Sequence, residues 1–308
     1  MKIKNPLFIF PFLFVCFFLP SRPADAGNKV LKIVATQTLF ADLVRQVGGD
    51  MVDVTAVAAP KFNIHFYQPK PSDVRNVSRC DLYVNAGLDL EAWSDPLLEA
   101  AGKRELFRHG PRNLDLSSGV RLLKIPQEPL SRAAGDVHVF GNPHYQMNPQ
   151  NARIMVEQIL AKLQEIDAPN AAYYKNNARH FLTRLEEKIG EWKKHCAHFA
   201  GEEIVSYHDD IVYFADFLGL KVEQYLEPKP GIPPTPKHLA FLENYIKEHT
   251  VKVIVMPTYY SRKEAEKIAK KVGIKVVSLC QAVGEMPGTG DFFSFFDYNI
   301  NAVSQGVQ

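Results

Sequence analysis

The stretch GNPHYQMNP, residues 141–149, decides how the rest of the chain is organised. His144 offers an imidazole nitrogen, and the preceding Pro143 restricts the backbone that presents this ring. Asn148 and Pro149 then have the residue types of a helix start, with asparagine as the N-cap and proline at the first helical position. A candidate metal ligand therefore stands where an α/β half of the chain gives way to a long helical region.

On both sides of this stretch, short apolar segments alternate with amphipathic ones. Such alternation is typical of a parallel sheet with helices packed on it. Strands are predicted at 30–35, 52–57, 81–87, 203–207, 222–225, 251–256 and 274–279, with one more short strand at 120–125. We therefore predict an α/β fold with two similar parallel-sheet lobes, one on each side of the helical region.

The longest helical pattern covers residues 170–195. Leu182, Leu185 and Ile189 recur at three- and four-residue steps, which makes one apolar stripe. At 1.5 Å per residue such a helix is about 40 Å long, enough to join the two lobes as a rigid connection. The alternative is a helix packed within one lobe. We predict a first lobe at 27–168, a linking helix at 169–198 and a second lobe at 199–308.

The first residues have the pattern of a signal peptide. Two lysines precede an almost wholly apolar run, residues 7–19, and small residues follow at 24–26. This pattern predicts a signal peptide over residues 1–26 that is cleaved near Ala26, leaving the mature chain in the periplasm. The apolar run is short for a membrane anchor, although an uncleaved anchor is the alternative.

The bulk composition is that of an ordinary globular protein, with 46% hydrophobic and 23% charged residues. The net charge of +2 argues against a nucleic-acid partner. Three cysteines follow the predicted cleavage point, Cys80, Cys196 and Cys280, so either one disulfide and one thiol or three buried thiols is expected. Their spacing does not match a structural zinc site.

Four candidate metal ligands lie in loops near strand ends or helix starts: His65, His144, His208 and Asp291. His65 and His208 follow predicted strands, and open α/β sheets bind ligands at the carboxyl ends of their strands. Three imidazoles and a carboxylate form a tetrahedral donor set that suits Zn²⁺ at about 2.0–2.2 Å. Two donors come from each half, so they meet only if the lobes face each other. At each position the alternative is a loop residue with no metal role.

Five motifs follow one another along the chain: NIHFYQPKPSD (63–73), NPHYQMNP (142–149), SYHD (206–209), PTP (234–236) and GDFF (290–293). Together they resemble the solute-binding proteins of zinc and manganese ABC importers, over nearly the whole chain after residue 26. The resemblance implies two α/β lobes joined by one long rigid helix. It also implies a metal ion held in the cleft between the lobes by His65, His144, His208 and Asp291.

The resemblance also implies a function. Such a protein captures Zn²⁺, with Mn²⁺ as the second choice, and delivers it to a membrane permease driven by an ATPase. The metal is its cargo, and we expect a monomer that is not an enzyme. Family members with glutamate at the third ligand position resemble manganese binders, whereas this chain has His208 there. The softer imidazole favours zinc.

One departure from the family pattern concerns residues 121–140. Many zinc-specific members carry a long loop rich in His, Asp and Glu there, but this chain has a single histidine in that segment, His138. We expect His138 to face solvent, with a spare metal donor as the alternative. Asp209, next to a candidate ligand, is a possible acceptor that would orient a ligand imidazole.

Two other functions compete with metal delivery. A zinc hydrolase keeps an open coordination position for water, which a fourth ligand at Asp291 would close. The chain also has no His-Glu-x-x-His run. A surface adhesin that holds metal only for stability would not release it to a chelator without unfolding.

Overall fold

The computed structural model describes residues 30–127, 138–229 and 231–308. The predicted signal peptide, residues 1–26, lies outside the described residues. Within the described parts of the chain, no helix is long and apolar enough to cross a membrane.

The N-terminal sheet has four parallel strands in the order β2-β1-β3-β4. Their bounds are β1 Leu31–Ala35, β2 Val52–Ala56, β3 Leu82–Asn85 and β4 Asn113–Asp115. Neighbouring residues of a strand face opposite sides. Accordingly, Ile33 packs in the core beside α1 and α4, whereas Val34 packs in the core beside α2 and α3. The bounds of these helices are α1 Thr38–Gly48, α2 Pro71–Arg79, α3 Ser94–Ala101 and α4 Ala152–Ile166.

The fourth strand differs from the sequence prediction. The sheet takes up Asn113–Asp115, and the predicted strand at 120–125 is a loop. The backbone of this loop has other partners: Leu123 N–H donates to the Tyr213 hydroxyl at 3.0 Å, and Leu123 O accepts from Asn142 N–H at 2.8 Å. These hydrogen bonds satisfy the backbone N–H and C=O of Leu123, so the segment does not need the hydrogen bonds that pairing with a neighbouring strand would supply.

The C-terminal sheet repeats the same plan, with four parallel strands in the order β6-β5-β7-β8. Helices α6 and α9 pack on one face, and α7 and α8 pack on the other. The bounds are β5 Glu203–Ser206, β6 Lys221–Tyr225, β7 Val253–Pro257, β8 Lys275–Leu279, α6 Val212–Leu218, α7 Pro236–Glu248, α8 Lys263–Val272 and α9 Phe292–Val307. The prediction of two similar parallel-sheet lobes is confirmed.

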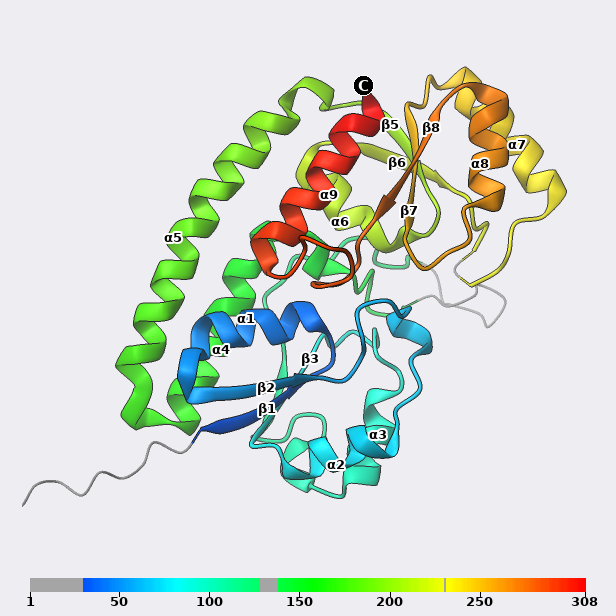
Figure 1. The fold of residues 1–308 in the computed structure, drawn as a ribbon. Helices are drawn as coiled ribbons and strands as arrows, with labels where there is room; N and C mark the ends of the chain where they lie inside the picture. Colours follow the sequence, from blue (N-terminus) through cyan, green and yellow to red (C-terminus); the bar gives the residue numbers. More distant parts are fainter. Residues whose placement is uncertain (1–29, 128–137, 230) are drawn as a thin grey trace, which may run out of the picture.

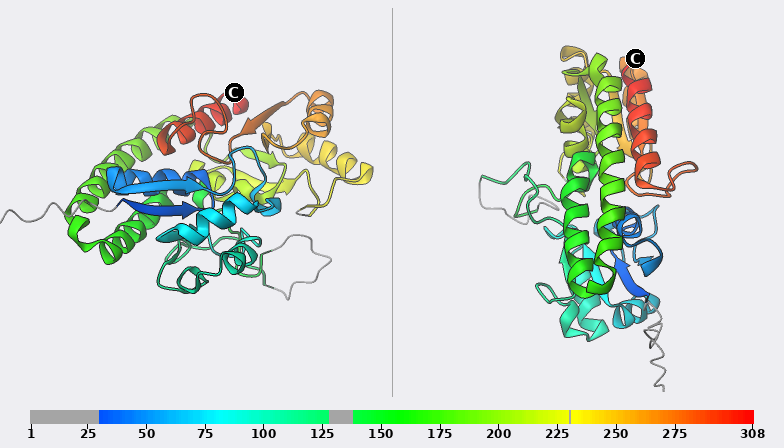
Figure 2. Two further views of the ribbon diagram at one scale, coloured as in Figure 1. Left: turned by 60° about the horizontal axis from the view of Figure 1, so that its bottom comes forward. Right: turned by 90° about the vertical axis from the view of Figure 1, so that its left-hand side faces the viewer.

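Helix α5, Ala171–Cys196, runs along one side of both lobes (Figures 1 and 2). Its 26 residues make it about 39 Å long. At the N-terminal lobe, Asn177 donates to the backbone oxygen of Val47 in α1 at 3.1 Å. At the C-terminal lobe, the Phe181 ring lies 5.4 Å from that of Phe292 and 5.1 Å from that of Phe293 in α9. The helix therefore braces both lobes, as predicted.

Hydrogen bonds also join the lobes directly. Thr38 donates its hydroxyl proton to the backbone oxygen of Val283 at 2.8 Å. Asn142 donates to the backbone oxygen of Asp209 at 2.7 Å. These contacts lie at the strand ends of both lobes, so they fix how the loops that carry the candidate ligands face each other.

The cysteines at 80, 196 and 280 are all buried and free. Of the two alternatives that the sequence left open, the structure therefore has the three buried thiols.

Candidate metal centre

Three of the predicted ligands meet between the lobes. One ring nitrogen each of His65, His144 and His208 lies within 4.8 Å of the others. The ring centres are 5.0 Å apart for His65 and His144, 5.9 Å for His65 and His208, and 5.8 Å for His144 and His208. Among the described residues, this is the only group of three or more His, Cys, Asp or Glu donors close enough to hold one ion.

His65 comes from the loop after β2 and lies in a single 3-10 turn, Ile64–Phe66. The Asn63 side chain starts this turn by accepting a hydrogen bond from the His65 N–H at 3.0 Å. The Asn63 amide also donates to the hydroxyl of Tyr260, in the other lobe, at 3.3 Å. The half-buried His65 ring is thus held at the lobe boundary, with its Nε2 3.1 Å from the Nε2 of His144.

His144 lies in the stretch 141–149, where the N-terminal α/β region gives way to the helical region. Its backbone N–H donates to the Asn142 side chain at 2.9 Å. The next residue, Tyr145, is fully buried and donates its hydroxyl proton to the backbone oxygen of Ala86, just after β3, at 2.8 Å. These contacts anchor the segment on both sides of the ring, and His144 itself is only 3% exposed.

His208 follows β5, and its ring lies between two carboxylates. Its Nδ1 is 3.1 Å from Glu227 Oε2, and its Nε2 is 3.3 Å from Asp209 Oδ1. The side chains of His208 and Glu227 are each 6% exposed. A histidine that binds a metal through one nitrogen commonly donates from the other to a carboxylate, so Glu227 fits the role of a group that orients the His208 ring.

The three imidazoles have different proton affinities. Burial lowers the pKa of His65 and His144 well below the usual histidine value, and the charges of neighbouring histidines lower it further. Burial also acts to lower the pKa of His208, but the hydrogen bond to Glu227 and the charges of Asp210 and Asp209 outweigh it and raise that pKa to about 9. At neutral pH two rings are therefore ready to bind a cation, and the third must first lose a proton.

Asp291, the fourth predicted ligand, is not brought to this group. Its carboxylate accepts a hydrogen bond from the Ser294 N–H at 2.8 Å and so caps the start of α9. The next N–H, that of Phe292, donates to Asp42 in α1 at 2.9 Å. The Phe292 contact thus ties the start of α9 to the N-terminal lobe. Asp291 is not among the described donors that lie within 4.8 Å of one another, and its role as the fourth ligand stays a prediction.

Comparison with known proteins places the chain in a family. Residues 33–306 match the family model described as "Zinc-uptake complex component A periplasmic". The chain belongs to the zinc-uptake component A family. Among relatives, it is 26% identical to the iron-binding protein YfeA of Yersinia pestis, over 93% of this chain and 89% of that protein. It is 24% identical to the manganese ABC transporter substrate-binding lipoprotein PsaA of Streptococcus anginosus, over 93% and 92%.

A crystal structure of ZnuA has the same fold, with a TM-score of 0.76 and 22% identity over 91% of this chain and all of that one. Members of the zinc-uptake family are substrate-binding proteins of metal ABC importers. The chain is therefore a metal-binding component that works with a membrane permease and an ATPase, and it is not an enzyme. The names of its relatives span zinc, manganese and iron.

Two neighbours of the cluster were not identified as such from the sequence. Glu227 was not singled out, and His138 was expected to face solvent. The His138 ring is half-buried, and its centre lies 5.2 Å from that of His65. The contact of Glu227 was open to prediction: Ser206 pairs with Tyr225, so the residues two positions further on, His208 and Glu227, leave adjacent parallel strands side by side.

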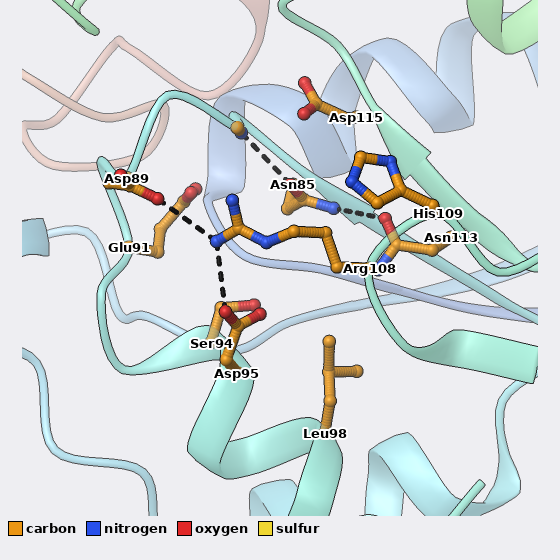
Figure 3. Close-up of a pocket in the computed structure, with 11 residues that line it drawn as sticks. Asn85, Asp89, Glu91, Ser94, Asp95, Leu98, Arg108, His109, Asn113 and Asp115 are labelled. Carbon is orange, nitrogen blue, oxygen red and sulfur yellow. Dashed lines mark hydrogen bonds and ion pairs between the residues drawn. The ribbon is translucent and has the colours of Figure 1, made fainter. Parts of the chain in front are cut away.

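Apart from the three-histidine group, a cavity of about 120 Å³ lies within the N-terminal lobe at the ends of β3 and β4 (Figure 3). We call it the second cavity. Arg108 reaches across it and donates to Asp89 and Asp95, both at 3.1 Å. His109 lines the same cavity. No donor group able to hold one ion is found here among the described residues. Arg108 is paired with two of the carboxylates that line it, so this cavity is not a candidate metal centre.

Proposed function

We propose that this protein captures Zn²⁺ with His65, His144 and His208 and delivers it to the permease of an ABC importer. The observation that carries this proposal is the meeting of three imidazoles from both lobes, with their ring nitrogens within 4.8 Å of one another. Such a set matches the nitrogen donors and the spacing of a tetrahedral zinc site. The metal is cargo, held until the protein reaches its permease.

Zinc is proposed over manganese and iron because of the donor type. Imidazole nitrogen suits Zn²⁺, whereas Mn²⁺ is better served by carboxylate, carbonyl and water oxygens. Relatives of this chain are named for iron and for manganese, so family membership alone leaves the metal open. The third ligand position favours zinc in this proposal, because it holds a buried imidazole nitrogen, that of His208, and not a carboxylate oxygen.

The location and the division of the chain follow from the same function. We propose that residues 1–26 direct export and are cleaved near Ala26, so that the protein works in the periplasm. The two lobes are proposed to be residues 27–168 and 199–308, with 169–198 as the linking helix. Because α5 contacts both lobes, metal release should need only small shifts of the lobes rather than wide opening at a hinge.

The proposal is tested by stripping the protein with a chelator and titrating it with Zn²⁺, Mn²⁺ and Fe²⁺. We expect a folded metal-free protein, one equivalent of Zn²⁺ bound, and weaker binding of the other two ions. His65→Ala, His144→Ala and His208→Ala should each weaken zinc binding. His109→Ala, a histidine of the second cavity, is the matched control and should not. Full zinc affinity in His144→Ala, or tighter binding of Mn²⁺ than of Zn²⁺, would show the proposal to be wrong.

A further inference from the structure

Five exposed apolar side chains come from segments that adjoin the three-histidine group. Among the described residues, Phe66, Ile125, Val139, Phe140 and Ile232 are between 40% and 62% exposed. Single exposed apolar residues are ordinary on a protein surface, whereas a group of them marks a surface that a partner covers. We call these five residues the apolar rim.

The apolar rim draws on both lobes. Phe66 follows His65 in the N-terminal lobe, and the centres of their rings are 6.3 Å apart. Phe66 Cζ is also 3.8 Å from the position that a Cβ on Gly231, in the C-terminal lobe, would take. Ile232 is the next residue along the chain, so Phe66 and Ile232 border the same boundary between the lobes.

The other members of the apolar rim border the group from a second segment. Residues 139 and 140 directly follow His138, whose ring centre is 5.2 Å from that of His65. Ile125 Cγ1 is 3.2 Å from the position that a Cβ would take on Gly141, the residue after this pair. The exposed apolar residues are therefore gathered around the lobe boundary rather than scattered singly over the molecule.

The three-histidine group is most open at His65, beside the apolar rim. His144 and His208 are 3% and 5% exposed, whereas His65 is half-buried. A partner that takes the ion without losing it to solvent must therefore cover the side of His65. The chain works with a membrane permease, so the permease is the partner that this surface has to meet.

The apolar rim is also connected to a candidate ligand. The Gly231 N–H donates to Glu227 Oε2 at 3.2 Å, and the same oxygen is 3.1 Å from His208 Nδ1. A partner that displaces Gly231 therefore also alters a contact that orients the His208 ring. A receiver of the ion needs such a connection, because the ligands must let go before the ion can pass on.

We propose that the apolar rim is the surface on which the permease docks, and that it meets an exposed apolar surface of the membrane-embedded subunit. This inference rests on the proposed function and names the contact that delivery uses. Burial of the apolar side chains supplies the affinity of the complex. Because the rim spans both lobes, the docked permease contacts Phe66 and Ile232 together, on either side of the boundary.

Zinc affinity and zinc uptake separate docking from binding. Phe66→Ser and Ile232→Ser should each bind zinc in solution like the natural protein. In the cells that make this protein, each should lower zinc uptake at limiting zinc about tenfold, because burial of one such side chain is worth about that factor in affinity. Phe241→Ser is the matched control, since Phe241 is 48% exposed but lies on α7, and it should change neither property. Normal uptake by both rim variants, or a loss of zinc affinity as large as the loss of uptake, would overturn the inference.

Photo-crosslinking in the same cells identifies what covers the apolar rim. Phe66→benzoylphenylalanine should crosslink to the membrane-embedded subunit of a metal ABC importer, identified by mass spectrometry, and Phe241→benzoylphenylalanine should not. Sedimentation with phosphatidylglycerol vesicles that Phe66→Ser abolishes, or a dimer that this variant abolishes, would overturn the inference in favour of a membrane surface or a second copy of this chain. Failure here is distinct from failure of the proposed function, because the zinc affinity of His144→Ala tests the latter alone.

Discussion

Replacing Glu227 by glutamine removes one charge beside His208 while keeping the side-chain volume. The carboxylate accepts from His208 Nδ1 at 3.1 Å, and both side chains are 6% exposed. Loss of such an outer partner typically weakens metal binding 10–100-fold, or about 1.4–2.8 kcal/mol. The same carboxylate also holds the competing proton on His208, so its removal has two opposing effects on zinc affinity.

The two effects separate with pH. A pKa of about 9 for His208 means that, at pH 7, proton competition weakens zinc binding in the natural protein about 100-fold. In Glu227→Gln the pKa of His208 falls toward its usual value, so this competition largely disappears. We therefore expect Glu227→Gln to bind zinc between about equally well and about eightfold more tightly than the natural protein at pH 7, and about 5–50-fold more weakly at pH 9, where the natural His208 is half deprotonated and the variant has almost no proton competition left to lose.

The assay is competition with a chromophoric chelator of known zinc affinity at pH 7, 8 and 9. Glu223→Gln is the matched control, because Glu223 lies on the same strand, β6, but is exposed. It should bind zinc like the natural protein at every pH. Equal affinity of Glu227→Gln and the natural protein at pH 9, or a ratio that does not change with pH, would refute this reasoning.

Three further predictions concern protons, helix capping and thiols. Zinc binding at pH 7 should release about one proton, because His208 is protonated in the free protein, and release should fall to about half a proton at pH 9 and toward zero at higher pH. Calorimetry at pH 7 that shows no dependence on the ionisation enthalpy of the buffer would contradict this. Asp291→Ala should lower the free energy of unfolding by about 0.5–2 kcal/mol through loss of the N-cap; a tenfold loss of zinc affinity in the same variant would make Asp291 a ligand as well, and unchanged affinity would exclude it. In the chain from residue 27 onward, Cys80, Cys196 and Cys280 should react with a thiol reagent only after denaturation, and fewer than three reactive thiols would reveal a disulfide.

Most of the fold was open to prediction because its strands are apolar and its longest helix has one apolar stripe. The exception is the fourth strand of the N-terminal sheet. Asn113–Asp115 is short and has only one buried residue, Leu114, so it lacks the pattern of a strand. The apolar residues at 120–125 had that pattern, but they pack and form hydrogen bonds with the other lobe. Periodicity reports which residues are buried and not what buries them.

Site residues could be predicted from the sequence where they directly follow a strand, because the end of the strand decides where they lie in the fold. His65 and His208 follow strands whose ends face the lobe boundary, and the structure brings them together with His144. Asp291 depends on a local arrangement that a motif does not settle, since capping its own helix takes one oxygen of the carboxylate and does not decide what the other oxygen contacts. The reciprocal contacts of Asp291 and Ser294, three residues apart, form a capping box, and that spacing was visible in the sequence.

Anomalous diffraction at the zinc edge from zinc-loaded crystals tests the central claim most directly. We predict one strong peak between the lobes, with a ring nitrogen from each of His65, His144 and His208 at about 2.0–2.1 Å. A zinc peak elsewhere in the molecule, or a bound ion that leaves His208 paired with its two carboxylates, would contradict the account.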